Sequence, residues 1–414
     1  MSKHLYINGP TNVVRLHNKE SNKVIYIFFD FHANAIYQTK CDDIRSDDVS
    51  TFLIKTFDNL KTEPKIYDFM FERDPTRPIY YNTKRKGNYI DQITYLLNKL
   101  FKIDPNKNIV VKSEEIPNVR FHWVDIRDYL LHFTDDLIYN YMPKVINDLH
   151  NNLTLANVSL LCDVTTLIKS QMISLYKLIY ETDNLSNPKI SKIMFSVNDT
   201  ILSTYSDKEY ETMSQKIIYK LLKSYNNKKI QDKILNIIND ELHDMFKDFF
   251  EFIDTGLLKL EKLKEHLVHV YNNSIYESLL LQENGTYDYG ITFEELNKYL
   301  YLFDSIQNKC DSILTDKIGV LLMDLYLLRR FLDKDYVTTT ITYTGASHSL
   351  NYIRLLVKYF DYDITNCSYV KNNDILNATN KIKKSKKIEE LNELFYSQEL
   401  IQCSDLGDFP KLFE

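Results

Sequence analysis

Short runs rich in apolar and aromatic residues alternate with amphipathic segments in the N-terminal part of the chain. The runs lie at residues 24–29, 66–71 and 119–124, and their composition is typical of buried strands. Segments with the apolar spacing of a helix, roughly 10–15 residues long, separate these runs. Near the C-terminus a fourth run at 337–343 and a strand pattern at 363–369 enclose another such segment. The pattern predicts βαβ units at both ends of the chain.

Helical spacing of apolar residues dominates the region between the two ends, from about residue 127 to residue 335. The simplest topology is an α/β fold in which one mostly parallel sheet is built from both ends of the chain, with a large helical insertion between them. The predicted division is an N-terminal α/β half over 1–130, a helical insertion over 131–335, and a C-terminal half over 336–414 that completes the sheet.

Polar residues with catalytic or ligand chemistry follow four of the predicted strands. His32 and Glu72 come just after the first two runs, Asp125 and Arg127 after the third, and His348 after the last. Ligands of open α/β sheets bind outside the carboxyl ends of the strands, where the loops leave a crevice. The sequence therefore predicts a shared site at this edge of the sheet.

Each of these residues also has a plain structural explanation. His32 and His348 can be histidines at the start of a loop or helix that bind nothing. A carboxylate after a buried run, such as Glu72, must be paired, hydrated or metal-bound, and an ion pair with Arg73 or Arg77 would satisfy it equally well. Two histidines at strand ends in separate halves of one sheet favour the shared site.

Two imidazoles and one carboxylate are a ligand set that catalytic metal ions use, because it leaves a coordination position open for water. The sequence thus predicts that His32, Glu72 and His348 bind a divalent metal ion whose identity stays open. Arg127 has the chemistry to hold a substrate carboxylate or a developing oxyanion, while a structural pair with Asp125 or Asp128 is the alternative.

Composition and charge exclude several other classes of protein. The net charge of −6 and the pI near 6.0 lack the basic footprint of a nucleic-acid-binding protein. No signal peptide is visible, and the apolar stretches are shorter than the roughly 20 residues of a membrane span. Five scattered cysteines without a C-x-x-C pair argue against a disulfide framework and favour a reducing cytoplasm: Cys41, Cys162, Cys310, Cys367 and Cys403. Frequent Asn, Ile and Lys indicate AT-rich codons, which are common in large DNA viruses.

Two further candidates have less support. His266 and His269 are three residues apart in a helical segment and have the spacing of metal ligands, but solvated or packed histidines are the more common case. Cys41 would act as a nucleophile only with a base such as His32 beside it. Gly-rich phosphate-binding motifs of the dinucleotide and P-loop types are absent from the sequence.

Three short motifs, in this order along the chain, resemble those of the superfamily that joins TIKI/TraB metalloproteases with erythromycin-esterase-like and ChaN-like proteins. They are Phe-Asp-Phe-His at 29–32, Phe-Met-Phe-Glu at 69–72 and Gly-Ala-Ser-His at 345–348, and Phe29 stands where the family has glycine. The segment 323–330, with Arg329, resembles the arginine-bearing helix before the last motif. The resemblance implies a metal-dependent hydrolase, although ChaN-like members are binders. The chain also resembles uncharacterised paralogous proteins of giant viruses.

The function predicted from sequence is a metal-dependent hydrolase of peptidase or esterase type, acting on a peptide or a small molecule in the cytoplasm, which is the host's if the protein is viral. Its expected catalytic residues are Glu72, Asp125, Arg127 and Arg329. One alternative is a non-catalytic α/β scaffold whose helical insertion binds a protein partner. The other is a metal-free esterase in which a histidine is the general base and Glu72 orients it. No nucleic acid or membrane partner is expected.

Overall fold

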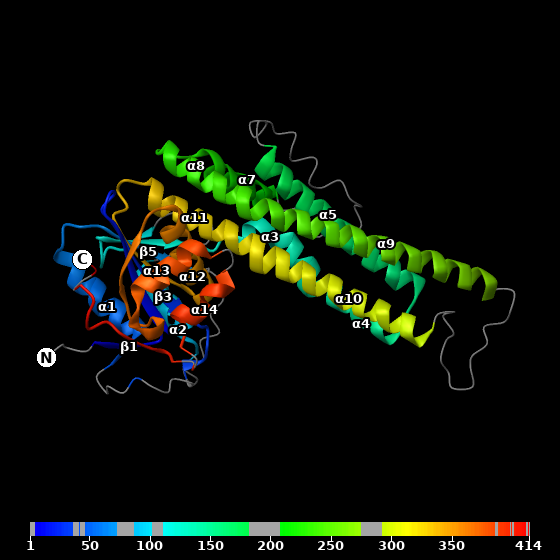
Figure 1. Cartoon of the computed structure of the whole chain (residues 1–414), viewed down its shortest axis with the longest axis horizontal. Helices are drawn as coiled ribbons and strands as arrows, with labels where there is room; N and C mark the ends of the chain where they lie inside the picture. The colour runs from blue at the N-terminus through cyan, green and yellow to red at the C-terminus, as the bar shows by residue number, and fades with distance from the viewer. Residues whose placement is uncertain are drawn as a thin grey trace. The chain divides into compact units, whose positions relative to one another are not determined.

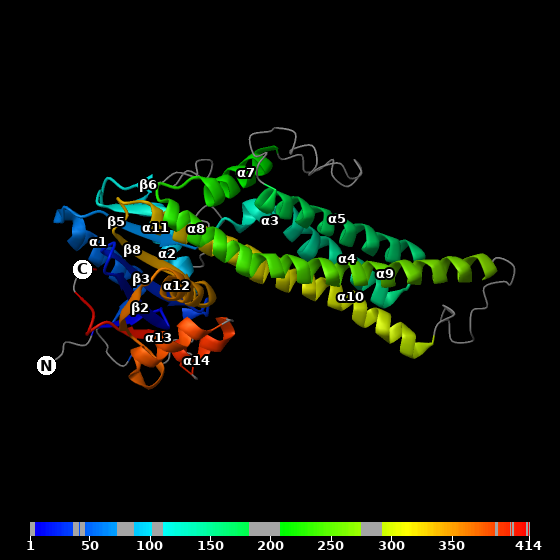
Figure 2. The same cartoon turned by 45° about the horizontal axis from the view of Figure 1, so that its top comes forward.

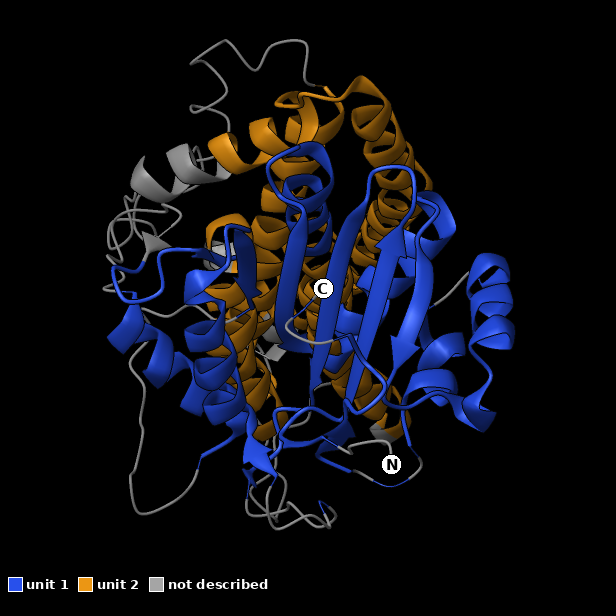
Figure 3. Cartoon of the chain, turned by 90° about the vertical axis from the view of Figure 1, so that its left-hand side faces the viewer, with its two compact units in different colours: residues 1–125, 323–414 blue, residues 126–322 orange. Residues whose placement is uncertain are grey.

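The computed structural model describes residues 5–35, 41, 46–72, 87–101, 111–181, 208–274, 292–385, 388–397, 399, 401–410 and 413. The chain forms two compact units (Figure 3). Unit 1 comprises residues 1–125 and 323–414, and unit 2 comprises residues 126–322. Because compactness does not show that a part folds by itself, the division at residues 130 and 335 stays a prediction.

The main sheet of unit 1 has seven strands in the order β6-β7-β5-β8-β3-β2-β9. In this order the strands are Val111–Lys112, Val119–Trp123, Tyr67–Phe71, Thr339–Gly345, Lys23–Asp30, Asn12–Asn18 and Asp363–Cys367. Strands β2 and β3 come from the N-terminal part of the chain, and β8 and β9 from the C-terminal part. The sheet is therefore built from both ends of the chain, as the sequence predicts.

The sheet is mixed, and "mostly parallel" describes only its centre. The neighbouring strands β7, β5, β8 and β3 pair in parallel, whereas β6–β7, β2–β3 and β2–β9 pair antiparallel. The run at 363–369 forms an edge strand paired with β2 instead of continuing the parallel order. Strand β2 was not predicted, because its seven residues include only three apolar ones, which neither form a continuous run nor alternate with polar residues. Buried parallel strands give a stronger sequence signal, since both of their faces are apolar.

Helices cover both faces of this sheet. Aromatic side chains of the central strands share one core cluster with α1 and α2, while α12 contacts β3 and β8 (Figures 1 and 2). The helices of unit 1 are α1 Val49–Asn59, η2 Leu60–Thr62, α2 Tyr89–Leu100, α12 Ala346–Tyr359, η8 Lys371–Asn373, α13 Ile375–Lys384, η9 Ile388–Leu391 and α14 Asn392–Phe395. Helix α11, Val320–Asp333, belongs to unit 1 from Met323 onward. The result is a three-layer arrangement with the sheet in the middle.

Lys23, at the start of β3, anchors the end of α11 to the sheet. Its buried Nζ donates to the backbone oxygens of Phe331, Leu332 and Lys334, at 2.8, 2.9 and 2.9 Å. The carbonyls of Phe331 and Leu332 are among those that the end of a helix leaves without helical partners, and Lys334 directly follows the helix. Lys23 thus ties the C-terminal end of α11 to β3.

A small sheet brings the two chain ends together in unit 1. Its strands are β10 Cys403–Asp405, β1 Tyr6–Asn8 and β4 Asp47–Asp48. A disulfide joins Cys41 to Cys403, with the Cα atoms 5.3 Å apart. The scattered cysteines therefore include one disulfide pair, which was not expected from the sequence, while the reducing cytoplasm inferred from them stays a prediction. The spacing of cysteines could not show this pair, because 362 residues separate its members.

The regular elements of unit 2 are helices throughout its described residues, as expected for the insertion. They are α3 Arg127–Asp136, η3 Leu137–Tyr141, α4 Met142–Asn151, α5 Leu155–Tyr180, α7 Lys208–Lys223, α8 Lys228–Ile237, η6 Ile238–Leu242, α9 His243–Ser274, α10 Phe293–Ile313 and η7 Leu314–Gly319. Helices α4, α5, α9 and α10 run side by side (Figure 1). Short π-helical segments, η3, η6 and η7, interrupt the α-helical geometry.

The helix α5 is long and apolar enough to cross a membrane by length and composition, with a mean hydropathy of 1.2 over 18 residues. The expectation that every apolar stretch falls short of a membrane span is thus wrong for α5. Just over half of this window, 56%, is buried inside the structure, and α5 contacts α9. A buried core helix passes the same test, so α5 is explained by packing in unit 2. The cytoplasmic location stays a prediction.

Candidate functional site

The register of the central strands brings the predicted residues to one edge of the sheet. Asp30 pairs with Gly345 across β3 and β8, and Phe71 pairs with Tyr343 across β8 and β5. Glu72, the next residue after β5, therefore lies beside the end of β8. The parallel order places all three carboxyl ends at the same edge.

His32 is held at the end of β3 by Asp30. The ring Nδ1 of His32 lies 2.5 Å from Asp30 Oδ2, which also accepts the backbone N–H of His32 at 3.1 Å. His32 adopts a left-handed backbone conformation with φ of 53°, which is uncommon outside glycine. The second carboxylate oxygen, Oδ1, accepts the hydroxyl of Tyr343 at 2.8 Å. Both oxygens of Asp30 thus have donors, and the turn directs the His32 ring toward Glu72.

Glu72 is the centre of the site. Its Oε2 accepts the backbone N–H of Gly345, and its Oε1 lies 3.3 Å from His348 Nε2 and 4.0 Å from His32 Nε2. Both imidazoles thus face the same carboxylate oxygen, which meets the expected proximity of the two histidines. The alternative partners of Glu72, Arg73 and Arg77, lie outside the described residues.

Gly345 lies so close to His32 and Glu72 that a side chain at this position would crowd them. A Cβ atom at this position would lie 3.0 Å from His32 Nε2 and 3.1 Å from Glu72 Oε2. Its backbone φ of −53° is open to any residue, so the constraint comes from the neighbouring atoms. A side chain here would occupy space beside the groups that converge on the site.

His348 is oriented by a second carboxylate. Its Nδ1 lies 2.6 Å from Oδ1 of Asp324, a buried residue of α11, and the other oxygen of Asp324 accepts the Asn351 amide at 2.6 Å. His348 is in the first turn of α12, so α11 and α12 together place its Nε2 against Glu72. The arrangement repeats that of His32, in which a carboxylate holds Nδ1 and leaves Nε2 toward Glu72.

The site is partly open to solvent at His32 and is otherwise buried. The His32 side chain is 46% exposed, whereas those of Glu72 and His348 are 8% and 5% exposed. Burial lowers the pKa of His32, but the hydrogen bond and charge of Asp30 and the charge of Glu72 outweigh it, so the pKa is raised above 6.5. The surroundings of this ring therefore favour a positive charge.

Among the described residues, no group of three His, Cys, Asp or Glu side chains is spaced as a ready-made metal cage. Two donors on a tetrahedral ion with ligand distances of about 2.1 Å lie about 3.4 Å apart. The separation of 3.3 Å between His348 and Glu72 matches this value, while the 4.0 Å between His32 and Glu72 exceeds it. The chemistry of the donor set fits a divalent ion. To complete the ligand set, the half-exposed His32 would have to move closer to Glu72.

The other predicted catalytic residues lie on different elements. Asp125 follows β7 in unit 1, and Arg329 is a buried residue of α11. Arg127 begins α3 in unit 2, where its charge acts to lower the pKa of Asp316 against a larger rise from burial. The hydrogen bonds and ion pairs of the site given above do not include these three residues, whose catalytic roles stay predictions.

The weaker sequence candidates have different outcomes. Cys41 is bonded to Cys403 and is not a free nucleophile, so that alternative is wrong. His266 and His269 lie on α9 in unit 2. Their role as metal ligands stays untested.

Sequence reasoning missed the two carboxylates that orient the histidines. Asp30 was visible two residues before His32, a spacing that permits a hydrogen bond from its side chain to the His32 backbone. Asp324 was visible as an acid within the apolar stretch at the start of a helix, where a buried charge requires a partner. Neither signal names the partner, because that depends on how helices and strands pack.

A second buried charged cluster lies on β5 and β7. His122 Nε2 is 2.5 Å from Asp68 Oδ1, and Arg120 Nε donates to the same oxygen at 2.8 Å. Burial lowers the pKa of His122 to about 4, against the raising effect of Asp68 and with help from the charge of Arg330. His122 is therefore a neutral, structural histidine at pH 7.

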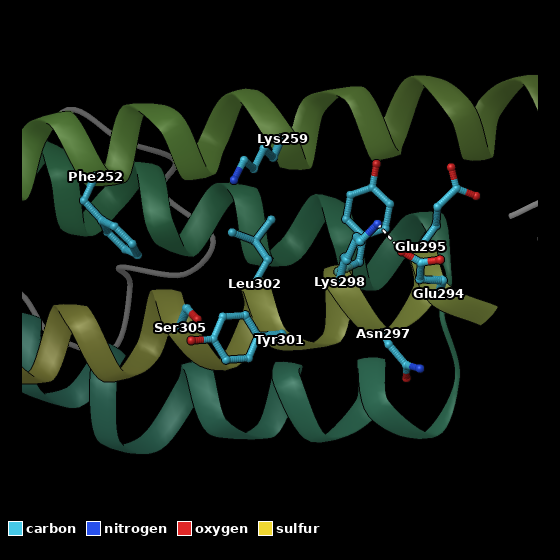
Figure 4. Close-up of a pocket in the computed structure, with 10 residues that line it drawn as sticks. Phe252, Lys259, Glu294, Glu295, Asn297, Lys298, Tyr301, Leu302 and Ser305 are labelled. Carbon is cyan, nitrogen blue, oxygen red and sulfur yellow. Dashed lines mark hydrogen bonds and ion pairs between the residues drawn. The ribbon is translucent and has the colours of Figure 1, made fainter. Parts of the chain in front are cut away.

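Unit 2 has a separate groove of about 770 Å³ between α9 and α10 (Figure 4). Phe252 and Lys259 line it from α9, and Tyr301 and Leu302 from α10. Tyr301 is 75% exposed, which is unusual for a large aromatic side chain. Apolar and charged groups together are typical of surfaces that bind other chains.

Comparison with known proteins identifies a family and several relatives. The sequence model of a family of unknown function, DUF5847, matches residues 5–414. The "Uncharacterized protein R706" of Acanthamoeba polyphaga mimivirus is 32% identical over 99% of this chain and 97% of its own length. "Uncharacterized protein R161" of the same virus is 30% identical over 99% of this chain and 98% of its own length. No solved structure matches. These relatives agree with the giant-virus setting expected from composition, and the chain belongs to the DUF5847 family.

Proposed function

We propose that the protein is a metal-dependent hydrolase whose divalent ion is bound by His32, Glu72 and His348. The observation that carries the proposal is a shared geometry: an aspartate oxygen lies against Nδ1 of each histidine, and each Nε2 faces Glu72 Oε1. A carboxylate oxygen accepts hydrogen bonds, so this arrangement favours a proton on Nδ1 of each ring. In the neutral rings each Nε2 is then an acceptor that faces Glu72 Oε1.

Three acceptors that face one another repel unless a positive charge lies between them. Either a metal ion or protons on the imidazoles would supply it. A metal ion fits the pairing of each histidine with a carboxylate. In metal sites such a carboxylate commonly holds one nitrogen of the ring so that the other nitrogen binds the metal. The order of the three motifs, which resembles that of TIKI/TraB and erythromycin-esterase-like proteins, supports the same choice.

When bound, a divalent ion acts as a Lewis acid and can lower the pKa of water to about 7. The chain's own residues supply the rest. Glu72 and His348 form the buried wall of the site, while the exposed side of His32 admits a peptide or small ester. We propose that Arg329, on the helix that carries Asp324, stabilises the developing oxyanion. Arg127 belongs to unit 2, and its part in the reaction stays a prediction.

His348→Ala should abolish binding of Zn²⁺ and turnover of ester or peptide substrates, because it removes a ligand while leaving the core of unit 1 in place. Zn²⁺ binding by calorimetry and hydrolysis of a panel of model substrates measure this. The matched control is His266→Ala on α9, which should bind and turn over as the wild type does. A chelator should stop the wild-type reaction.

Each contrary outcome has a meaning. Wild-type Zn²⁺ affinity and activity in a folded His348→Ala variant would end the hydrolase proposal. Activity that persists in chelator but is lost in His348→Ala would instead favour the metal-free esterase with a histidine base. An interaction scaffold is the second candidate, and the groove between α9 and α10, with its exposed Tyr301, is the observation that favours it.

A further inference from the structure

A series of buried hydrogen bonds continues from the site into helix α12. From Asp324, which holds His348, it passes to the amide of Asn351, whose Oδ1 accepts both Nε and Nη2 of Arg354 at 3.0 and 2.9 Å. All four residues are at most 5% exposed. His348, Asn351 and Arg354 follow one another at intervals of three along α12, so they share one face of the helix.

The chemistry of Arg354 settles how Asn351 is oriented. A guanidinium only donates hydrogen bonds, so the oxygen of the Asn351 amide must face Arg354 and its NH₂ group must face Asp324. The amide then occupies Oδ2 of Asp324 and leaves Oδ1 to His348. Reversing the amide would place an oxygen against a carboxylate and two donors against a guanidinium, which both cost free energy.

The charges of the connected residues point in the same direction. Asp30, Glu72 and Asp324 are three buried carboxylates, and Arg354 is the one cation whose described hydrogen bonds join it to them. A divalent cation bound at Glu72 would offset the charge that these carboxylates share, since buried carboxylates are costly unless positive charge lies beside them.

We propose that Asn351 and Arg354 are positioning residues that fix Asp324, and through it the Nδ1-protonated form of His348, for binding a divalent ion. The inference rests on the proposed metal site. Tyr343 has the same role for His32 that Asn351 has for His348, because its hydroxyl donates a hydrogen bond to Asp30, the carboxylate that holds the His32 ring. The two histidines are thus supported differently: a neutral phenol supports one carboxylate, and an amide joined to a guanidinium supports the other.

Co²⁺ is the probe for the test, because its visible absorption reports coordination geometry as well as binding. In Asn351→Leu, which removes both links at nearly constant volume, Co²⁺ affinity should fall by about 10–100-fold and the visible bands should change. Arg354→Lys keeps the buried charge and a single donor, so its affinity should lie between those of the wild type and Asn351→Leu. Ser349→Ala is the matched control.

Ser349 is buried on the same helix and bonds to Thr344 and to the backbone of Phe28, away from Asp324. Its variant should lose stability yet keep the wild-type affinity and bands. Wild-type affinity and bands in both Asn351→Leu and Arg354→Lys would overturn the inference. Should Asn351→Leu fail to fold, Arg354→Lys decides alone: reduced affinity supports the inference, and wild-type affinity overturns it. Absence of Co²⁺ binding by the wild type would instead contradict the proposed metal site itself.

Discussion

At the scale of single residues, the site depends on conformations that its neighbours impose. His32 has a positive φ, and the Asp30 carboxylate holds both its backbone N–H and its ring. Such conformations persist where surrounding contacts over-determine them, and they are common at functional sites. Gly345 contributes by lacking a side chain, which leaves space for His32 and Glu72.

Gly345→Ala should weaken metal binding while leaving the protein folded. The new methyl group would lie 3.0 Å from His32 Nε2 and 3.1 Å from Glu72 Oε2, so the half-exposed His32 should be displaced first. We expect about ten-fold lower Co²⁺ affinity, the size of effect seen when a ligand's orientation is disturbed, with a thermal midpoint that changes little. Gly256→Ala on α9 is the control, since its methyl would make an ordinary contact at 3.4 Å. Equal affinities in the two variants would refute this account.

At the scale of elements, neighbouring strands are joined by charged pairs as well as by backbone hydrogen bonds. Asp68 of β5 lies directly opposite Arg120 of β7, and both Arg120 and His122 bond to its carboxylate. Cross-strand pairs of this kind stabilise a sheet when their charges are opposite. The low pKa of His122 shows that burial of the imidazole dominates over its attraction to Asp68.

The low pKa of His122 predicts a loss of stability in acid. With a pKa of about 4 in the folded state and 6.5 in the unfolded state, the unfolded chain binds the proton between these values and the folded chain does not. The free energy of unfolding should therefore fall as the pH falls from about 6.5 to 4, by on the order of 3 kcal/mol from this group.

His122→Gln keeps a donor toward Asp68 but does not titrate, so its unfolding free energy should fall less over the same pH range. Urea unfolding of both proteins at several pH values measures the difference in slope. Parallel curves for wild type and variant would show that His122 does not contribute to this pH dependence.

At the scale of the whole molecule, the two ends of the chain complete one unit. Strand β8 lies between β3 and β5, and β10 pairs with β1. The Cys41–Cys403 disulfide joins segments 362 residues apart in the same unit. Cross-links that close long loops restrict the unfolded chain most, although strain in the folded state can reduce the gain.

Reduction of this disulfide should lower the stability of the chain by about 2–4 kcal/mol. Thermal unfolding with and without a reductant measures the change, which should appear as a lower midpoint in the reduced protein. The double variant Cys41→Ser, Cys403→Ser should unfold at the reduced midpoint and should not respond to reductant. An oxidised wild type that unfolds at the same temperature as its reduced form would contradict the prediction.

The sequence by itself determined the strands around His32, Glu72 and His348 and the helical character of unit 2. Buried parallel strands and long amphipathic helices depend on residues that are close in the chain, so their apolar spacing reveals them. The position of the polar residues after the strands then indicated the edge of the sheet where they would meet.

Only the tertiary structure decided which partners these residues have. The insertion of β8 between β3 and β5 and the pairing of β9 with β2 join segments that are distant in sequence, and His348 and Asp324 come from two different helices. The pairing of Cys41 with Cys403 is of the same kind. Such contacts depend on the packing of whole elements, and local spacing carries no information about them.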